Sequence, residues 1–157
     1  MRVFIRNDYE SLSQFAATLI LDLVNDNAQK LVNVAFPAGY TVKRTYELLA
    51  ASGTSLANVR AFHIDEFIGL DADDDKLQRN WMYDNLYSKV DIKTGNVHYL
   101  DPNAADLQEE CARFEALISS HGGLDLAFFG TGADGHVARN EVRSGEELKS
   151  PCVLEIG

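Results

Sequence analysis

Apolar residues along the chain follow two different spacings. Short, nearly continuous apolar runs, such as residues 31–36 and 59–64, are typical of buried strands in a parallel sheet. Between such runs, apolar positions recur every three or four residues, which is the spacing of a helix with one buried face. We therefore expect strands over residues 3–5, 31–36, 59–64, 97–100, 124–129 and 152–156, and helices over 7–27, 42–51, 79–90 and 103–121.

Polar residues at the element boundaries add detail to this prediction. Asn7 is placed to cap the first helix, with Glu10 in the capping-box position, and Asn103 is placed to cap the last helix. Strands that alternate with helices form right-handed βαβ units, which build a parallel sheet with helices on both faces. No repeat, linker or change of composition divides the sequence. We expect residues 1–157 to form one domain of the α/β class.

Charge and hydropathy narrow the kinds of partner that the protein can bind. Lys and Arg number 14 against 24 Asp and Glu, so the net charge is −10 with neutral histidines. Nucleic acids and anionic membranes bind basic surfaces, so we expect neither as a partner, although a local pocket for a small phosphate ester remains compatible. The longest apolar stretch, residues 15–24, is too short to span a membrane. Residues 1–6 do not resemble a signal peptide, so we expect a cytoplasmic protein.

Three segments with unusual residues follow predicted strands. They are residues 37–41, the pair Asp65 and Glu66, and residues 130–141. Ligands of an open parallel sheet bind beyond the carboxyl ends of the strands. These segments are far apart in the sequence but are expected to meet at one edge of the sheet, which predicts a single active site.

The first segment has the features of a phosphate-binding turn. Gly39 lets the backbone approach a ligand closely, and the amides that open the next helix attract an anion. Thr41 adds a hydroxyl group. Lys43 and Arg44 either assist in binding the anion or face solvent. An ordinary turn before a helix is the alternative interpretation.

The acidic pair after the third predicted strand has two interpretations. A carboxylate at this edge is placed to act as a general base, and partial burial raises the pKa of such a group. The alternative is a cap for a turn or a helix. By strand alternation His63 shares a face with Asp65, but a packed and hydrogen-bonded histidine is the favoured interpretation for it.

The segment 130–141 carries the strongest chemical signal. Glycines 130, 132 and 135 permit tight backbone turns around Asp134 and His136, and Glu141 follows. An imidazole between two carboxylates has its tautomer fixed and its protonated form stabilised, as an acid–base shuttle requires. A glycine-rich turn with a capped helix start is the alternative. A metal site is disfavoured, because no second His or Cys stands at ligand spacing.

The motifs in these segments are FPAGYT (residues 36–41), HIDEFIGL (63–70) and GTGADGHVARNE (130–141). In this combination they resemble the glucosamine-6-phosphate deaminase/isomerase family, over about residues 1–141. The resemblance implies a Rossmann-like three-layer αβα sandwich with a mainly parallel sheet. It also implies an enzyme that converts glucosamine 6-phosphate or galactosamine 6-phosphate to the ketose 6-phosphate and ammonia, with no metal and no other cofactor.

The resemblance also implies roles for individual residues. Asp65 is expected to move a proton between C2 and C1, and His136 to assist opening of the sugar ring, with Asp134 and Glu141 orienting it. The contacts to substrate and phosphate are expected from Ala38, Gly39, Tyr40, Thr41, Glu66, Gly132 and Gly135. Nothing after Glu141 matches the family well, so we expect the domain to be incomplete at its C-terminus.

Two other functions stay open. A 6-phosphogluconolactonase-like hydrolase resembles this family in fold, but Phe67 after the acidic pair and the ending Asn140-Glu141 favour the isomerase. A non-catalytic sugar-phosphate sensor is the third hypothesis, although it has no need of the full acid–base set. In every case the expected partner is a small sugar phosphate. The sequence leaves open the hexosamine epimer and the formation of a homo-oligomer.

Overall fold

The computed structural model describes residues 2–132, 135 and 136 of the chain. Its strands form one parallel sheet in the order β3-β2-β1-β4. The strands are β1 (Val32–Phe36), β2 (Val59–His63), β3 (Val97–His98) and β4 (Leu126–Ala127). The helices are α1 (Tyr9–Asp26), α2 (Tyr40–Ala51), α3 (Gln78–Asn85) and α4 (Leu107–Ser120), with 3₁₀ turns at Tyr87–Lys89 and Thr94–Asn96.

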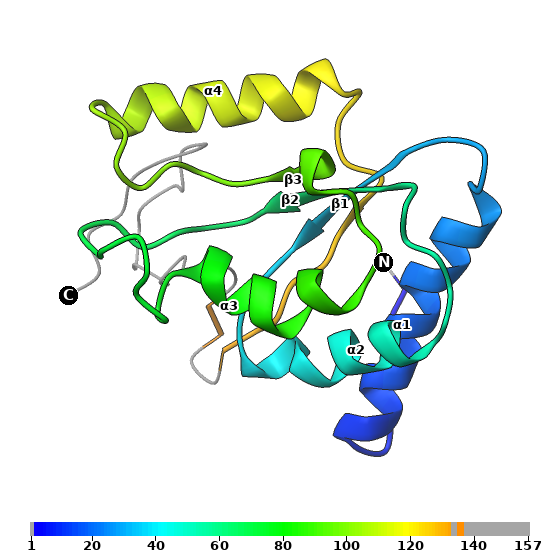
Figure 1. Ribbon diagram of the computed structural model, residues 1–157. Helices are drawn as coiled ribbons and strands as arrows, with labels where there is room; N and C mark the ends of the chain where they lie inside the picture. Colours follow the sequence, from blue (N-terminus) through cyan, green and yellow to red (C-terminus); the bar gives the residue numbers. More distant parts are fainter. Residues whose placement is uncertain (1, 133–134, 137–157) are drawn as a thin grey trace.

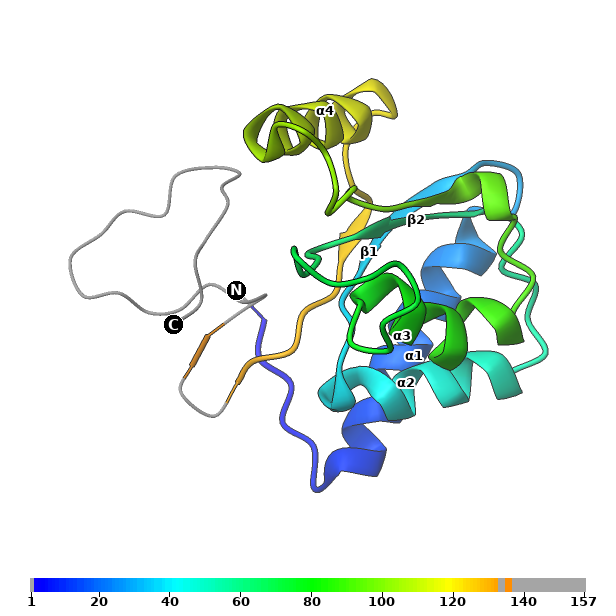
Figure 2. The same ribbon diagram turned by 60° about the vertical axis from the view of Figure 1, so that its left-hand side comes forward.

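The elements form three layers (Figures 1 and 2). Helices α1, α2 and α3 lie on one face of the sheet and α4 lies on the other. This arrangement confirms the expected αβα sandwich with a parallel sheet. No helix among the described residues is both long and apolar enough to cross a membrane.

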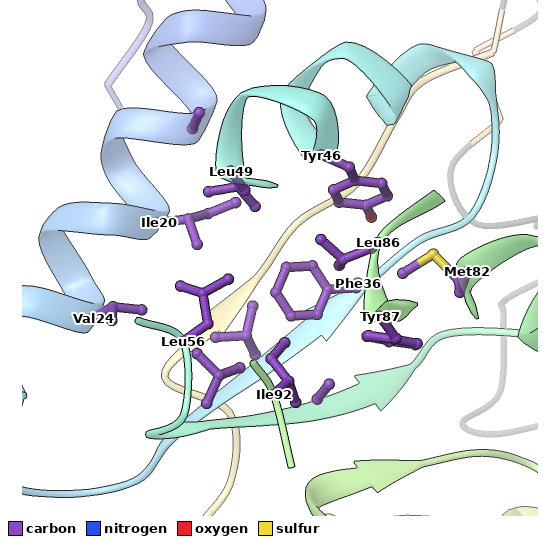
Figure 3. Close-up of a cluster of buried hydrophobic side chains, with 14 of the residues drawn as sticks. Ile20, Val24, Phe36, Tyr46, Leu49, Leu56, Met82, Leu86, Tyr87 and Ile92 are labelled. Atoms are coloured by element: carbon purple, nitrogen blue, oxygen red, sulfur yellow. The ribbon is translucent and has the colours of Figure 1, made fainter. Parts of the chain in front are cut away.

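The core fills the space between the sheet and helices α1 to α3 (Figure 3). Every residue of β1 is buried, because β1 pairs with β2 on one side and with β4 on the other. Phe36 of β1 packs among Ile20 of α1, Leu49 of α2 and Met82 of α3. Burial of such large side chains contributes about 2 kcal/mol each, so this layer supplies much of the stability.

The opposite face of the sheet is joined to α4 by a buried polar side chain. Asn33 of β1 is 6% exposed and donates two hydrogen bonds of 2.8 Å, to the carbonyls of His121 and Gly123. Arg60 of β2 donates to the Asn33 side-chain oxygen at 3.0 Å. The Asp125 carboxylate accepts from the Asn33 backbone amide at 2.8 Å. One asparagine therefore fixes the connection between α4 and β4 against the two central strands.

The helices begin at different residues from those predicted. Asp8, rather than Asn7, caps α1, and Ser11 completes the capping box in place of Glu10. Asp106, rather than Asn103, caps α4 through the amides of residues 108 and 109. Aspartate is as good a capping residue as asparagine, so the local sequence did not separate the two alternatives.

The predicted strand over residues 3–5 is wrong. Val3 is 70% exposed and Ile5 is 86% exposed, and neither belongs to the sheet. Phe4 packs on Phe15 at 4.8 Å between ring centroids, and the Arg6 guanidinium lies 3.9 Å from the centroid of the Phe15 ring. These contacts are local, and a strand also needs a partner with which to form a ladder. The expected strand over 152–156 lies outside the described residues.

Candidate active site

The order of the strands creates a candidate site at one edge of the sheet. From β1 the chain continues to β2 and β3 on one side, whereas β4 pairs with β1 on the other side. In open α/β sheets, ligands bind at the carboxyl ends of the two strands where this reversal occurs. The segments that leave β1 and β4 at that edge are residues 37–41 and 128–132.

Residues 37–39 lead directly into α2, and with the first two helical residues they form what we call the 37–41 turn. Gly39 precedes the helix with φ of 121°, a conformation that favours glycine, and this N-cap residue has no side chain with which to cap the helix. The first amides of an α-helix have no partner within the helix. Because α2 begins at Tyr40 and not at residue 42, the amides of Tyr40 and Thr41 belong to this first turn. Such a turn suits an anion.

The segment after β4 lies against the same turn. A Cβ atom built on Gly130 would be 3.2 Å from Cβ and 3.3 Å from Cγ2 of Thr41. A glycine at position 130 is thus what lets the two segments approach so closely. The structure brings these predicted site segments together, although 88 residues separate Thr41 from Gly130.

Two tyrosine hydroxyls contact the carbonyls of the 37–41 turn. The Tyr46 hydroxyl, on α2, donates to the Pro37 carbonyl at 2.5 Å, and the Tyr9 hydroxyl, on α1, donates to the Tyr40 carbonyl at 3.0 Å. Neither tyrosine is among the site residues predicted from the sequence. Both lie in helical segments, and the spacing of apolar positions in a helix does not predict the partner of a hydroxyl group.

Arg44 is held by two carboxylates. Its guanidinium forms two bonds with Glu10, at 2.7 and 3.0 Å, and a third with Glu47 at 3.0 Å. These partners raise the pKa of Arg44 and keep it charged. The side chain faces solvent in part, because it is 38% exposed beside its carboxylate partners. A role of Arg44 in binding the anion stays a prediction.

The acidic pair at the end of β2 divides between two environments. The Glu66 carboxylate accepts hydrogen bonds from the amides of Phe67, Gln78 and Arg79 at 2.8, 2.7 and 3.0 Å. It therefore caps α3, whose own N-cap residue, Leu77, has no polar side chain to do so. Asp65 precedes it and is half-buried at the same edge of the sheet. A direct contact from Glu66 to substrate stays a prediction.

His63 is packed inside the protein, as expected. It is 3% exposed, and burial lowers its pKa to about 3, so the imidazole is neutral at ordinary pH. Its ring meets Tyr99 edge-on at 4.4 Å and lies 5.7 Å from the Tyr87 ring, measured between centroids. The expected hydrogen bond is absent at Nε2, which has no partner among the described residues.

Backbone hydrogen bonds of a turn link the described residues 132, 135 and 136 of the glycine-rich segment after β4. The Gly135 amide donates to the Gly132 carbonyl at 3.0 Å, and the Gly132 amide donates to the His136 carbonyl at 2.9 Å. Gly135 has φ of 90°, which favours glycine at that position. The turn ends at His136, which is half-buried. Asp134 and Glu141 lie outside the described residues.

Within the described part of the chain, no group of three or more His, Cys, Asp or Glu side chains is placed to hold a metal ion. The arrangement at this edge is one of backbone amides, a half-buried aspartate and a histidine. Such groups bind an anion and move protons.

The chain is similar in sequence and in structure to enzymes of sugar phosphates. The family model described as glucosamine-6-phosphate isomerases/6-phosphogluconolactonase matches residues 7–139. A glucosamine-6-phosphate deaminase of Phocaeicola vulgatus is 38% identical over 148 residues, which cover 90% of this chain and 56% of that protein. The chain spans 54–57% of the length of the curated relatives that it matches.

Two solved structures extend the similarity to the fold. A monomeric glucosamine-6-phosphate deaminase aligns with a TM-score of 0.84 and 31% identity, over 90% of this chain and 59% of that one. A 6-phosphogluconolactonase from Thermotoga maritima aligns with a TM-score of 0.72 and 26% identity, over 88% of this chain and 62% of that one. Of these two structures, the deaminase is the more similar to this chain in both fold and sequence.

Proposed function

Because the chain belongs to the family of glucosamine-6-phosphate isomerases and 6-phosphogluconolactonases, we propose that it acts as an amino-sugar-phosphate deaminase/isomerase. The substrate is glucosamine 6-phosphate or its galactosamine epimer. The products are the ketose 6-phosphate and ammonia, with water consumed. The observation that carries the proposal is the 38% identity to a glucosamine-6-phosphate deaminase over 90% of this chain.

In this proposal the phosphate of the substrate binds at the start of α2. The amides of residues 38–41 surround it, and the partial positive charge of the helix N-terminus stabilises it. Gly130 permits the segment after β4 to close over the same turn. The sugar then extends from this turn toward Asp65 and His136.

The chemistry is assigned to four side chains. His136 assists opening of the sugar ring, and Asp134 and Glu141 orient its imidazole. Asp65 moves a proton between C2 and C1, which converts the aldose to the ketose and lets the amine leave as ammonia. The half-buried position of Asp65 at the end of β2 supports this role, as does the resemblance of residues 63–70 to the family motif.

We further propose that the reaction needs no cofactor and takes place in the cytoplasm. No metal ion or other cofactor is required for an acid–base isomerisation of this kind. Sugar phosphates are charged and do not cross membranes freely, so we place the protein in the cytoplasm with its substrate. Light scattering after gel filtration measures separately whether the protein is a monomer or a homo-oligomer.

Ammonia release from glucosamine 6-phosphate and galactosamine 6-phosphate tests the proposal. Asp65→Asn removes the base, and we expect a loss of about 100-fold or more in kcat. Asp73→Asn is the matched control, because Asp73 lies in an exposed loop, and it is expected to keep full activity. Inertness of the natural protein on both hexosamine phosphates contradicts the proposal.

Two other outcomes favour the alternative functions. Hydrolysis of 6-phosphogluconolactone without release of ammonia assigns the chain to the lactonases, one of which shares its fold at 26% identity. Binding of a sugar phosphate by calorimetry, with no turnover, indicates a sensor.

A further inference from the structure

Two tyrosine hydroxyls donate hydrogen bonds to carbonyls of the 37–41 turn. The Tyr46 hydroxyl donates to the carbonyl of Pro37, at the start of the turn, and the Tyr9 hydroxyl donates to the carbonyl of Tyr40, at its end. Tyr9 also accepts a hydrogen bond of 3.2 Å from the amide of Arg44. The Tyr46 hydroxyl therefore holds the peptide plane between Pro37 and Ala38. The Tyr9 hydroxyl reinforces the plane between Tyr40 and Thr41, which also belongs to the first turn of α2.

Fixing a carbonyl also fixes the amide in the same peptide unit. A trans peptide is planar, and its C=O and N–H point in opposite directions. The described residues contain no cis peptide bond. The Pro37 carbonyl points to Tyr46, so the Ala38 N–H points away from it. The Tyr40 carbonyl points to Tyr9, and the Thr41 N–H likewise points away.

The surroundings of Tyr46 make its hydrogen bond durable. The residue is fully buried, and its ring lies 5.9 Å from the Phe36 ring and 6.2 Å from the Trp81 ring, measured between centroids. Figure 3 shows it among the core side chains below α2. Burial also raises the pKa of Tyr46, so the hydroxyl keeps the proton that it donates.

Tyr87 shows that burial of a tyrosine in this core does not by itself create such a bond. It is 8% exposed, and its hydroxyl has no hydrogen-bond partner among the described residues. The contact from Tyr46 to the turn is therefore specific.

Tyr9 is held in place independently of the turn. It is the first residue of α1, beside the Asp8 cap, and the ion pair between Glu10 and Arg44 ties the same end of α1 to α2. The start of α1 thus supports the anion-binding end of α2.

We propose that Tyr46 and Tyr9 are positioning residues, which orient the amides of Ala38 and Thr41 toward the phosphate of the substrate. The inference rests on the proposed function, because it assumes that the turn binds phosphate. Neither tyrosine touches the substrate. Each acts through a backbone carbonyl and limits the reorganisation that binding would otherwise require.

Phosphate binding by Tyr46→Phe provides the first test. Inorganic phosphate is titrated into the protein and its binding is followed by calorimetry or by amide chemical shifts. We expect about three- to tenfold weaker binding, the usual scale for one lost hydrogen bond. Tyr87→Phe is the matched control, because it removes a buried hydroxyl that has no described partner, and it is expected to leave the affinity unchanged.

Enzyme kinetics separate positioning from general loss of structure. Phosphate contacts are the same in the ground state and the transition state, so Tyr46→Phe should raise KM by a similar factor and leave kcat within about twofold. If Tyr46→Phe folds poorly, Tyr9→Phe provides the same test, because Tyr9 is half exposed and its loss disturbs the core less. Tyr83→Phe, on the surface of α3, is the control for Tyr9→Phe.

The outcomes distinguish this inference from the proposed function. Unchanged phosphate affinity in folded Tyr46→Phe and Tyr9→Phe overturns the inference alone. Weaker binding in both, without ammonia release by the natural protein, supports the inference and contradicts the deaminase reaction. Absence of phosphate binding by the unsubstituted protein overturns the inference, whereas the deaminase reaction is decided separately by release of ammonia from the hexosamine phosphates.

Discussion

Asp65 and Glu66 are neighbours in the chain, and at the scale of single residues their carboxylates have different tasks. Both oxygens of Glu66 accept backbone amides: Oε1 from Phe67 and Gln78, and Oε2 from Arg79. This carboxylate has little capacity left for a ligand. Under the proposed function Asp65 carries the proton transfer, while Glu66 fixes the start of α3 beside it.

Replacement of Glu66 measures this capping role. Glu66→Ala leaves the amides of Gln78 and Arg79 without their acceptor, so we expect a loss of about 1–2 kcal/mol in the free energy of unfolding. Glu66→Gln keeps one acceptor oxygen and should lose less. Urea denaturation gives both values. A raised KM without any loss of stability would instead indicate a direct contact with the substrate.

His63 makes the fold sensitive to acid. Its pKa is about 3 in the folded protein and 6.5 in the unfolded chain, so the unfolded chain takes up a proton first as the pH falls. The contribution of neutral His63 to stability is complete above pH 6.5 and is lost progressively toward pH 3. Between pH 7 and pH 5, protonation of this residue in the unfolded chain lowers the free energy of unfolding by about 2 kcal/mol.

Chemical denaturation at pH 7 and pH 5 checks the role of His63. His63→Phe keeps a ring against Tyr87 and Tyr99 but does not titrate, so it should lose about 2 kcal/mol less than the natural protein over this interval. Burial and nearby positive charges also lower the pKa of His98, which leaves a smaller acid effect in the variant. An equal loss in both proteins contradicts the assignment to His63.

At the scale of elements, the contact between the turn before α2 and the segment after β4 defines the candidate site. Gly130 lies so close to Thr41 that an added methyl group at position 130 requires the Thr41 side chain to shift by a few tenths of an ångström. We expect Gly130→Ala to lower stability by about 1 kcal/mol and to raise KM for the sugar phosphate several-fold. The measurements are urea denaturation and steady-state kinetics.

Gly95→Ala is the control for this substitution. A Cβ atom on Gly95 meets no described atom within 4 Å, and its φ lies outside the left-handed region. We expect a change in stability within about 0.5 kcal/mol and no change in KM. If the two alanine variants have the same stability and the same KM, the close approach of Gly130 to Thr41 is not required for either property.

How far the sequence predicts these elements depends on the range of the interactions. Strands β1 and β2 are recognised from apolar runs, because nearly all of their residues are buried. Residues 3–5 show the same pattern, but only the tertiary structure reveals that they do not join the sheet. The hydroxyl bond of Tyr46 and the contact of Gly130 with Thr41 depend on distances between elements, which no local pattern contains.

At the scale of the whole molecule, the sheet carries two unlike layers. The layer of α1, α2 and α3 is held by an extensive apolar core. On the other face, Phe114 of α4 packs edge-on against Phe62 of β2, with 6.1 Å between ring centroids. Polar contacts add to this packing, because Asn33 is bonded to the carbonyls of His121 and Gly123 where α4 ends. Because β4 follows this connection, Asn33 also sets the position from which the chain enters the candidate site.

Asn33→Ala tests whether this one side chain couples α4 to the sheet. It removes both donors and leaves two carbonyls and the Arg60 guanidinium without their partner, so we expect a loss of about 2–4 kcal/mol in the free energy of unfolding. Asn25→Ala, at an exposed position of α1, should change stability by no more than about 0.5 kcal/mol.

Hydrogen exchange locates the effect of Asn33→Ala within the molecule. If the coupling is local, amides of α4 and β4 exchange faster because they open locally. Amides of α1 and α2 still exchange only when the whole molecule unfolds. The 37–41 turn is then undisturbed, but the segment that follows β4 moves more freely, and we expect KM for the sugar phosphate to rise without a change at that turn. A uniform loss of protection in every helix would mean that the two layers unfold as one unit and that Asn33 contributes only to global stability.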